Sequence, residues 1–291
     1  MLWAAYAFAA AVFHAMGSII GKKVLQHEHA LEYGASQGVY LLLLVFALPF
    51  IDLAYDWRVF IALYVISVIL TAGNLYYLRS VRHSELSSCM PLMNISPLFL
   101  LVIAFVLLGE MPDALAILGV FLLVMGTYFL QMGTAGKHKG LWAPFKTLAR
   151  SRYALYMIFA MLIFSFTATM QKAVVNWGID VITIVVLVRL FMAVNYVGFE
   201  TAKHGFGEIV GDLKRDGLQI FGSTFTSFMS DIALLLAMGV PGALVSLIIP
   251  VKRLSTFFTS LIGGRLFHEH RLGLKLMACC VMLVGVVLVV V

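Results

Sequence analysis

Two adjacent cations, Lys252 and Arg253, lie within an otherwise apolar run of the sequence, Gly242–Ile262. A charge at the centre of a membrane-spanning helix costs roughly 2.5–3.5 kcal/mol on insertion scales, so a compensating group is required. A compact ammonium beside a planar guanidinium suits a phosphate or a carboxylate. The pair therefore predicts contact with an anionic substrate. The alternative is an internal ion pair that holds helices together.

Three further polar residues at mid-helix positions bear on this choice. Arg189, in "IVVLVRLFMAV", is a third cation near the predicted membrane centre and joins the predicted substrate site. Asp231 is the expected partner of Lys252 or Arg253, because Asp231 and Lys252 lie ~12 and ~15–16 Å from the connection between their helices. A protonatable coupling group is the other role open to Asp231. His14 is either a pH-sensitive gate or a hydrogen-bonded core residue.

The composition predicts an all-α membrane protein. Hydrophobic residues make up 62% of the 291 residues and charged residues 12%, against about 25% charged in soluble proteins. The formal charge of +6 comes mostly from Lys and Arg in predicted connections, and we expect no nucleic-acid partner. Apolar runs long enough to cross ~30 Å of hydrocarbon predict ten transmembrane helices, at about 2–21, 33–53, 59–80, 85–108, 113–132, 153–174, 180–200, 217–238, 241–263 and 271–291.

An internal repeat organises these helices. The basic connection 133–152 separates a first repeat, 1–132, from a second repeat, 153–291. A shift of 159 positions aligns 84–130 with 243–289 without a gap, and it matches prolines, glutamates and glycines: Pro91 with Pro250, Glu110 with Glu269, and Gly126 with Gly285. Because each repeat has an odd number of spans, the second enters the membrane upside down. Inverted repeats are typical of secondary transporters, whose substrates bind between the repeats near the midplane.

The repeat also suggests roles for the matched polar residues. Asn94 aligns with Arg253 and is a candidate for hydrogen bonding to the substrate. Glu110 and Glu269 come where the following helix begins, and a carboxylate near a helix N-terminus is favourable, so we expect structural roles for both. The two "HEH" triplets, 27–29 and 268–270, lack the spacing of a metal-binding helix, and no metal site is predicted.

The distribution of Lys and Arg predicts the orientation. Most of them fall in connections on one side of the predicted helices, including 133–152, whereas Arg58 and Lys172 lie on the other. The positive-inside rule then predicts a cytoplasmic 133–152 connection and both termini outside. We expect a multi-pass protein of the cell membrane (plasma or inner), surrounded by lipid, as a monomer or homodimer.

The sequence "MPLMNISPLFLLVIAFVLLGE", 90–110, resembles the repeat signature of the EamA-like branch of the drug/metabolite transporter superfamily. In that signature a proline-containing helix ends in Gly-Glu. The sequence "IPVKRLSTFFTSLIGGRLFHE", 249–269, is similar to it, with His268 in place of the glycine. The Lys252–Arg253 pair is also similar to a pair in plastid triose-phosphate translocators that binds phosphate. The resemblance implies ten helices in two inverted repeats and the transport of small molecules.

These features predict a secondary transporter that moves a small organic anion by alternating access. No G-x-x-x-x-G-K-[ST] motif occurs, so we expect neither ATP nor another cofactor. Two alternatives are open. One is an exporter of amino acids or amphipathic drugs in which the buried charges are structural. The other is a membrane enzyme or lipid flippase that uses Lys and Arg against a lipid phosphate. Because no cluster of nucleophile and base occurs in the sequence, we do not expect an enzyme.

Overall fold

A computed structural model describes residues 2–84, 90–134 and 151–266, together with 281, 284, 285, 287 and 288. Glu269 and most of the last predicted span, 271–291, lie outside the described residues. The elements in chain order are α1 (Leu2–Leu25), α2 (Ala30–Leu42), η1 (Leu43–Phe50), α3 (Trp57–His83), η2 (Met90–Ile95), α5 (Ser96–Leu108), α6 (Ala114–Thr134), α8 (Arg152–Asn176), α9 (Val181–His204), α10 (Phe206–Gly239), α11 (Val245–Lys252) and α12 (Leu254–Leu266).

The helices are apolar and long, as the composition predicts. Among the described residues, six are long and apolar enough to cross a membrane, and two apolar helices, Leu92–Leu108 and Ala114–Gly126, are shorter. The six are Leu2–Leu25, Ala30–Phe50, Trp57–His83, Arg152–Asn176, Val181–His204 and Phe206–Gly239. The chain is therefore an all-helical, multi-pass membrane protein.

Short polar residues and glycine set several helix ends. Ser151 Oγ accepts a hydrogen bond from Ala154 N at the start of α8, at 3.4 Å. Asp180 Oδ2 accepts from Thr183 N at the start of α9, at 3.0 Å. Both satisfy a backbone donor that has no partner within its helix. At the other end of a helix, Gly109 terminates α5 with φ of 67°, a left-handed conformation that glycine adopts without strain.

The span predicted at 241–263 is two helices and not one. It consists of α11 and α12, with Arg253 as the residue between them. Pro250, inside α11, has no backbone N–H and its ring disturbs the preceding turn. The backbone N of Arg253 donates to the carbonyl oxygens of both Ile249 (3.0 Å) and Pro250 (3.1 Å). The two sequence-predicted cations therefore lie at the break between α11 and α12.

The described part of the span predicted at 85–108 is also divided, by a change from a 3-10 helix to an α-helix with no residue between them. It consists of η2, which contains Pro91, followed by α5, which carries a proline in its first turn. A shift of 159 positions carries Asn94, near the end of η2, onto Arg253. The two breaks thus fall at matched positions in the two halves of the sequence.

Two other predicted boundaries differ from the observed ones. The helix predicted at 217–238 begins earlier, at Phe206, and kinks at Asp216, where φ is −123° and ψ is 16°. The segment 206–216 is amphipathic, and its polar residues interrupt the apolar run. The sequence therefore predicted a later start for this helix. The span predicted at 33–53 is α2 followed by the 3-10 helix η1, which contains Pro49.

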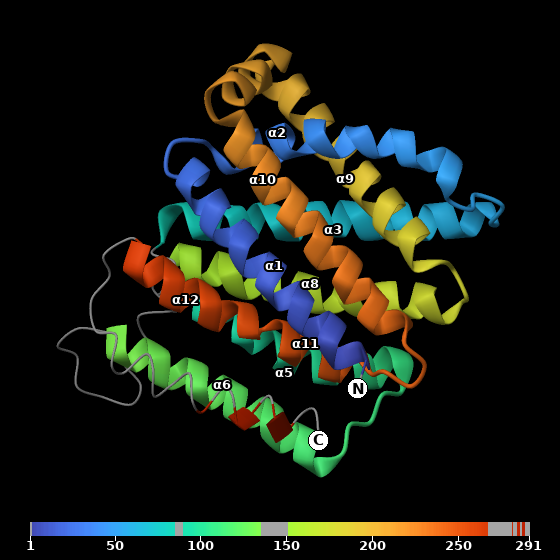
Figure 1. Cartoon of the computed structure of the whole chain (residues 1–291), viewed down its shortest axis with the longest axis vertical. Helices are drawn as coiled ribbons and strands as arrows, with labels where there is room; N and C mark the ends of the chain where they lie inside the picture. The colour runs from blue at the N-terminus through green and yellow to red at the C-terminus, as the bar shows by residue number, and fades with distance from the viewer. Residues whose placement is uncertain are drawn as a thin grey trace.

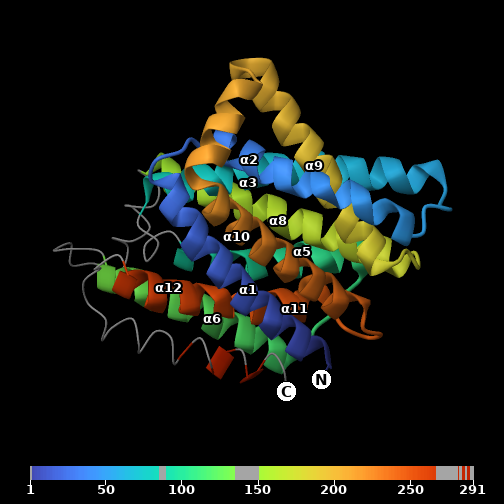
Figure 2. The same ribbon diagram turned by 45° about the horizontal axis from the view of Figure 1, so that its top comes forward.

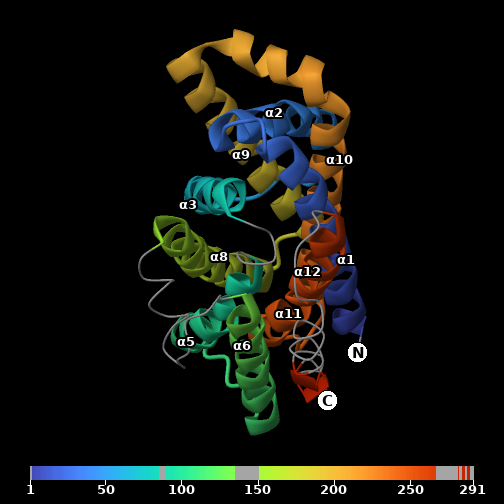
Figure 3. The ribbon, with the colours of Figure 1, turned by 90° about the vertical axis from the view of Figure 1, so that its left-hand side faces the viewer.

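Helices from the two halves of the sequence pack against one another. The helices α1 and α10 lie side by side (Figure 1), and Ser230 Oγ donates to Ala10 O at 2.8 Å. A Cβ on Gly17 would lie 2.9 Å from Thr226 Oγ1, so α1 approaches α10 closely only because this position is glycine. Figure 3 shows α2, α3 and α9 in one part of the molecule and α5, α6 and α11 in the other. In Figure 2 the junction between α9 and α10 projects beyond the other helices.

Candidate functional site

A cavity of about 170 Å³ lies among the helices of the two halves. Five residues that the sequence predicts for a binding or coupling role line it: His14, Arg189, Asp231, Lys252 and Arg253. They come from α1, α9, α10 and α11 and from the break between α11 and α12. The fold therefore gathers around one space charges that are far apart in the sequence.

The cavity's carboxylate has a different partner from the expected one. Asp231 Oδ2 accepts a hydrogen bond from Arg189 Nε and forms an ion pair with Arg189 Nη2, and no bond to Lys252 or Arg253 is found among the described residues. The pair joins α9 and α10, consecutive helices that pack together. Because α9 packs against α10, it brings Arg189 into contact with Asp231, which depth along the helices alone does not reveal. Both side chains are partly exposed, at 18% for Arg189 and 25% for Asp231, because they face the cavity.

The two adjacent cations differ in their contacts. Arg253, 5% exposed, donates from Nε to Ser96 Oγ at 2.8 Å, which links the break of the second half to the start of α5 in the first. Lys252 is 9% exposed and lines the cavity. Its ammonium makes no hydrogen bond or ion pair with any residue that the structure describes. With His14 neutral, three cations and one carboxylate leave the cavity a net charge of +2.

Asn94 lies beside the cavity and not on its wall. It is fully buried, and its Nδ2 donates to Thr256 Oγ1 at 3.1 Å. The hydroxyl of Thr256 in turn lies 2.8 Å from the carbonyl oxygen of Arg253. In this arrangement the amide joins the break of the first half to the break of the second, and the substrate contact of Asn94 stays a prediction.

His14 is half-buried on the cavity wall, and its ring centroid lies 6.4 Å from that of Tyr77. Its Nε2 atom is buried and has no hydrogen-bond partner among the residues described. A ring nitrogen in this position is open to a ligand or to a proton. Both roles that the sequence left open, gate and core residue, remain predictions.

Sequence reasoning missed the uncharged polar wall of the cavity. Gln37 Nε2 donates to Tyr33 OH at 3.1 Å, and Tyr33 OH donates to Ser223 Oγ at 2.8 Å. Asn74 Nδ2 donates to Tyr196 OH at 3.0 Å. The available signal was a lone polar residue in an apolar run, as in "YGASQGVYLL" and "LTAGNLYYL". That signal is weak because such residues also bond to neighbouring helices, and only the fold selects those that face a cavity.

Glu110 is bound to the N-terminus of a helix, but not of the helix that follows it. Its buried carboxylate accepts from Val245 N (2.9 Å), Ser246 N (3.0 Å) and Ser246 Oγ (2.6 Å), all at the start of α11. The next helix in the chain, α6, is capped instead by Asp113, which accepts from Ala116 N at 2.7 Å. The carboxylate therefore joins the two halves of the sequence.

A sequence profile of the EamA-like transporter family matches residues 1–132. No curated protein matches the sequence. A solved structure, described only as the crystal structure of a protein, is similar with a TM-score of 0.64 and 13% sequence identity, over 97% of this chain and 98% of that chain. At this identity the likeness concerns the fold alone. Residues 1–132 thus carry the sequence pattern of the EamA-like transporter family, in the drug/metabolite transporter superfamily, whose members are transporters of small molecules and not enzymes.

Proposed function

We propose that this protein is a secondary transporter of a small organic anion that bears a phosphate or a carboxylate. The observation that carries the proposal is the Lys252 ammonium, which is buried on the wall of a positively charged cavity without a partner in the described chain. An unpaired charge in this setting is unfavourable unless a ligand neutralises it. Intramembrane ionisable residues that face a cavity commonly belong to substrate pathways.

The chemistry of the walls supports a bipartite substrate. The anionic group contacts Lys252 and the terminal amino groups of Arg253, whose planar fork matches two oxygens of a phosphate or carboxylate. The rest of the substrate lies toward Tyr33, Gln37 and Asn74, which offer hydrogen-bonding groups without charge. Arg189 has its charge offset by Asp231, so it contributes to the positive field less than Lys252 does.

We infer ten helices in two inverted repeats, 1–132 and 153–291, joined by 133–152. The matched breaks near Asn94 and at Arg253 support this arrangement, because discontinuous helices at a repeat interface are typical of transporter binding sites. A close contact across the halves also supports it: a Cβ on Gly285, the repeat equivalent of Gly126, would lie 2.7 Å from Gly119 O.

Alternating access requires one side of the cavity to open while the other is closed. Several lining residues belong to the ends of helices on the basic side, among them Leu25 and Val81. On the opposite side, Glu110 holds the start of α11, and Lys172 Nζ donates to Met238 O at 2.6 Å. We propose that the described state is closed at Glu110 and that the basic side, with 133–152, faces the cytoplasm of a cell whose plasma or inner membrane holds the protein.

The Arg189–Asp231 pair favours a second candidate. A pair of opposite charges on a cavity wall is also suited to the two charges of an amino acid, so an exporter of amino acids or amphipathic drugs is the alternative. In that case Lys252 has no ligand role.

A thermal-shift screen of the purified protein separates the two candidates, since a ligand that binds the folded state raises its apparent stability. The classes to compare are phosphorylated sugars, carboxylates and amino acids. We expect an anion class to raise the melting temperature of the parent and of Lys23→Gln, an exposed control of equal charge change, but not of Lys252→Gln. A shift by amino acids that Lys252→Gln retains would replace the anion proposal by the exporter.

A further inference from the structure

Acidic side chains gather at the end of the bundle where the turn between α1 and α2 meets the junction of α9 and α10. Glu32 belongs to α2, and Glu200 and His204 belong to the last turns of α9. Figure 2 shows this junction projecting from the molecule. None of these three residues lines the central cavity. The cluster is therefore separate from the proposed transport site and does not depend on the proposed function.

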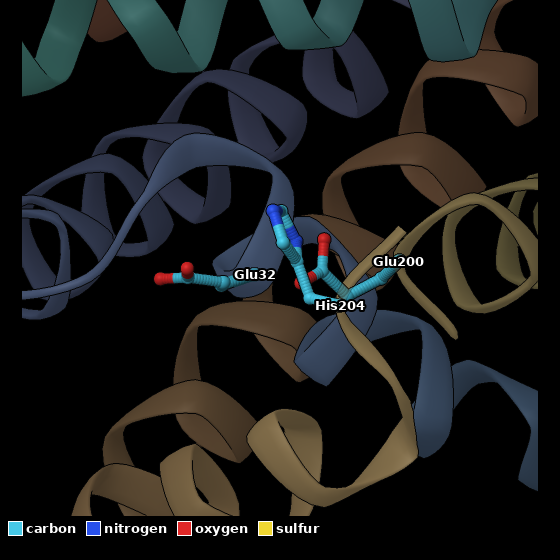
Figure 4. Close-up of side chains that lie close together, drawn as sticks. All are labelled: Glu32, Glu200 and His204. Carbon is cyan, nitrogen blue, oxygen red and sulfur yellow. The ribbon is translucent and has the colours of Figure 1, made fainter. Parts of the chain in front are cut away.

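The spacing of the cluster fits one metal ion. One possible ligand atom from each of Glu32, Glu200 and His204 lies within 4.8 Å of the other two. Figure 4 shows the Glu200 carboxylate next to the His204 ring, with Glu32 on the neighbouring helix. Metal–ligand bonds of about 2.0–2.4 Å place ligands on opposite sides of one ion about 4–5 Å apart. Glu28 and Asp212 form a second group of the same spacing with Glu32, so they add negative charge beside the first.

Glu200 of the cluster and Asp212 of the second group have buried carboxylates that are incompletely paired. Glu200 is 0% exposed, and its Oε2 has no hydrogen-bond partner among the described residues. The Asp212 side chain is 9% exposed, and its Oδ2 also lacks a partner there. Arg215 contacts Glu28 and Asp212, but its side chain is 57% exposed and therefore screened by solvent. Buried anionic oxygens without donors are unfavourable, and a bound cation would satisfy them.

The hydrogen bonds within the cluster leave ligand atoms available. His204 Nδ1 and Glu200 Oε1 lie 2.7 Å apart, so both atoms can bind one ion, which then replaces the proton that they share. Glu32 Oε2 accepts from His29 N at 2.9 Å, which fixes this side chain at the start of α2 and leaves its Oε1 atom. The arrangement thus supplies two carboxylates and one imidazole.

We propose that Glu32, Glu200 and His204 bind one divalent metal ion of the kind that accepts both oxygen and imidazole ligands, such as Mn²⁺. The ion joins α2 of the first half to α9 of the second at this end of the bundle. The "HEH" triplets, from which sequence analysis predicted no metal site, supply none of these ligands. The signal in the sequence is instead Glu200 and His204 four residues apart, on one face of a helix.

Titration of tag-free, EDTA-treated protein with Mn²⁺, followed by the electron paramagnetic resonance signal of free Mn²⁺, tests this site. We expect saturable binding of one ion per chain and a melting temperature that rises with Mn²⁺ concentration. Glu200→Gln removes one ligand and should weaken binding at least about tenfold. If Glu200→Gln does not fold, His204→Gln provides the same test, because the His204 side chain is 39% exposed and its replacement should leave folding intact.

The matched control is Glu208→Gln, which removes the same charge from an exposed position in the first turn of α10. It should bind Mn²⁺ with the affinity of the parent. Absence of saturable binding below roughly 1 mM Mn²⁺ would overturn the proposal. So would an equal weakening in Glu208→Gln and Glu200→Gln, since binding would then be a general attraction of cations to an acidic surface.

Discussion

The two ends of the short helix α11 carry buried charges that differ in their hydrogen bonds. At the N-terminal end, the Glu110 carboxylate accepts hydrogen bonds from two backbone N–H groups and from the Ser246 hydroxyl. At the C-terminal end, Lys252 faces the cavity and has no partner in the described part of the chain. Each charge has the sign that the helix dipole favours at its end. The dipole therefore does not distinguish them, but their hydrogen bonds do.

We infer from this difference that the Glu110 charge is structural and that the Lys252 charge binds a ligand. A buried carboxylate with all its donors in place stabilises the packing that supplies them, as Glu110 does between α5 and α11. A buried ammonium without an acceptor opposes folding, so its retention needs another reason. Removal of the first should cost stability, and removal of the second should cost only function.

The largest expected effect on stability comes from Glu110→Ala. It leaves the N–H groups of Val245 and Ser246 buried without acceptors, and each such group costs about 1–3 kcal/mol. We expect the free energy of unfolding to fall by about 3 kcal/mol, measured by denaturation in detergent micelles. Asp113→Ala, which removes a single capping bond from an exposed carboxylate nearby, should cost only about 1 kcal/mol. Equal losses in the two variants would contradict a special role for Glu110.

A smaller loss is expected from Asp231→Asn. It leaves the Arg189 guanidinium unpaired, and breaking a buried pair costs about 3–5 kcal/mol. Because both side chains are partly exposed to the cavity, we expect about 2 kcal/mol. The double variant Arg189→Gln/Asp231→Asn should recover most of that stability. If the double variant is as unstable as Asp231→Asn, the loss of stability does not come from an unpaired Arg189.

Arg253→Lys should have a smaller effect on stability and a large one on transport. It removes the bond from Nε to Ser96 Oγ, and a hydrogen bond to a charged group contributes about 1.5–3 kcal/mol. We expect a loss near the lower figure, together with impaired transport, since lysine does not reproduce a bidentate fork. Ser96→Ala is the control: it breaks the same bond but keeps the fork, so it should transport better than Arg253→Lys. If Ser96→Ala transports less than Arg253→Lys, the contact with Ser96 matters more for transport than the guanidinium fork.

The sequence predicted the class of fold and most of the charged groups at the cavity. Apolar runs revealed the spans because lipid imposes length and composition on each helix separately. A charged or titratable residue in such a run is rare, and this rarity singled out Lys252, Arg253, Arg189, Asp231 and His14. All five line one cavity.

What the sequence did not reveal depends on which helices become neighbours. Asp231 was paired with the wrong cation because depth along a helix says nothing about the direction in which a side chain points. Glu110 was expected to contact the next helix in the chain, whereas the fold brings α11 of the other half to it. The acidic cluster at Glu200 went unnoticed because its members become close only when α2 packs against α9.

The most direct test of the central claim is transport by Lys252→Gln in proteoliposomes. The substrate is the anion identified by thermal shift, and Lys23→Gln, with the same loss of charge at an exposed position, is the control. We predict that Lys252→Gln folds with an unfolding free energy within about 0.5 kcal/mol of the parent or above it, because no pair is broken. We also predict that it loses transport while Lys23→Gln retains it. Full transport of the anion by a well-folded Lys252→Gln protein would contradict the account.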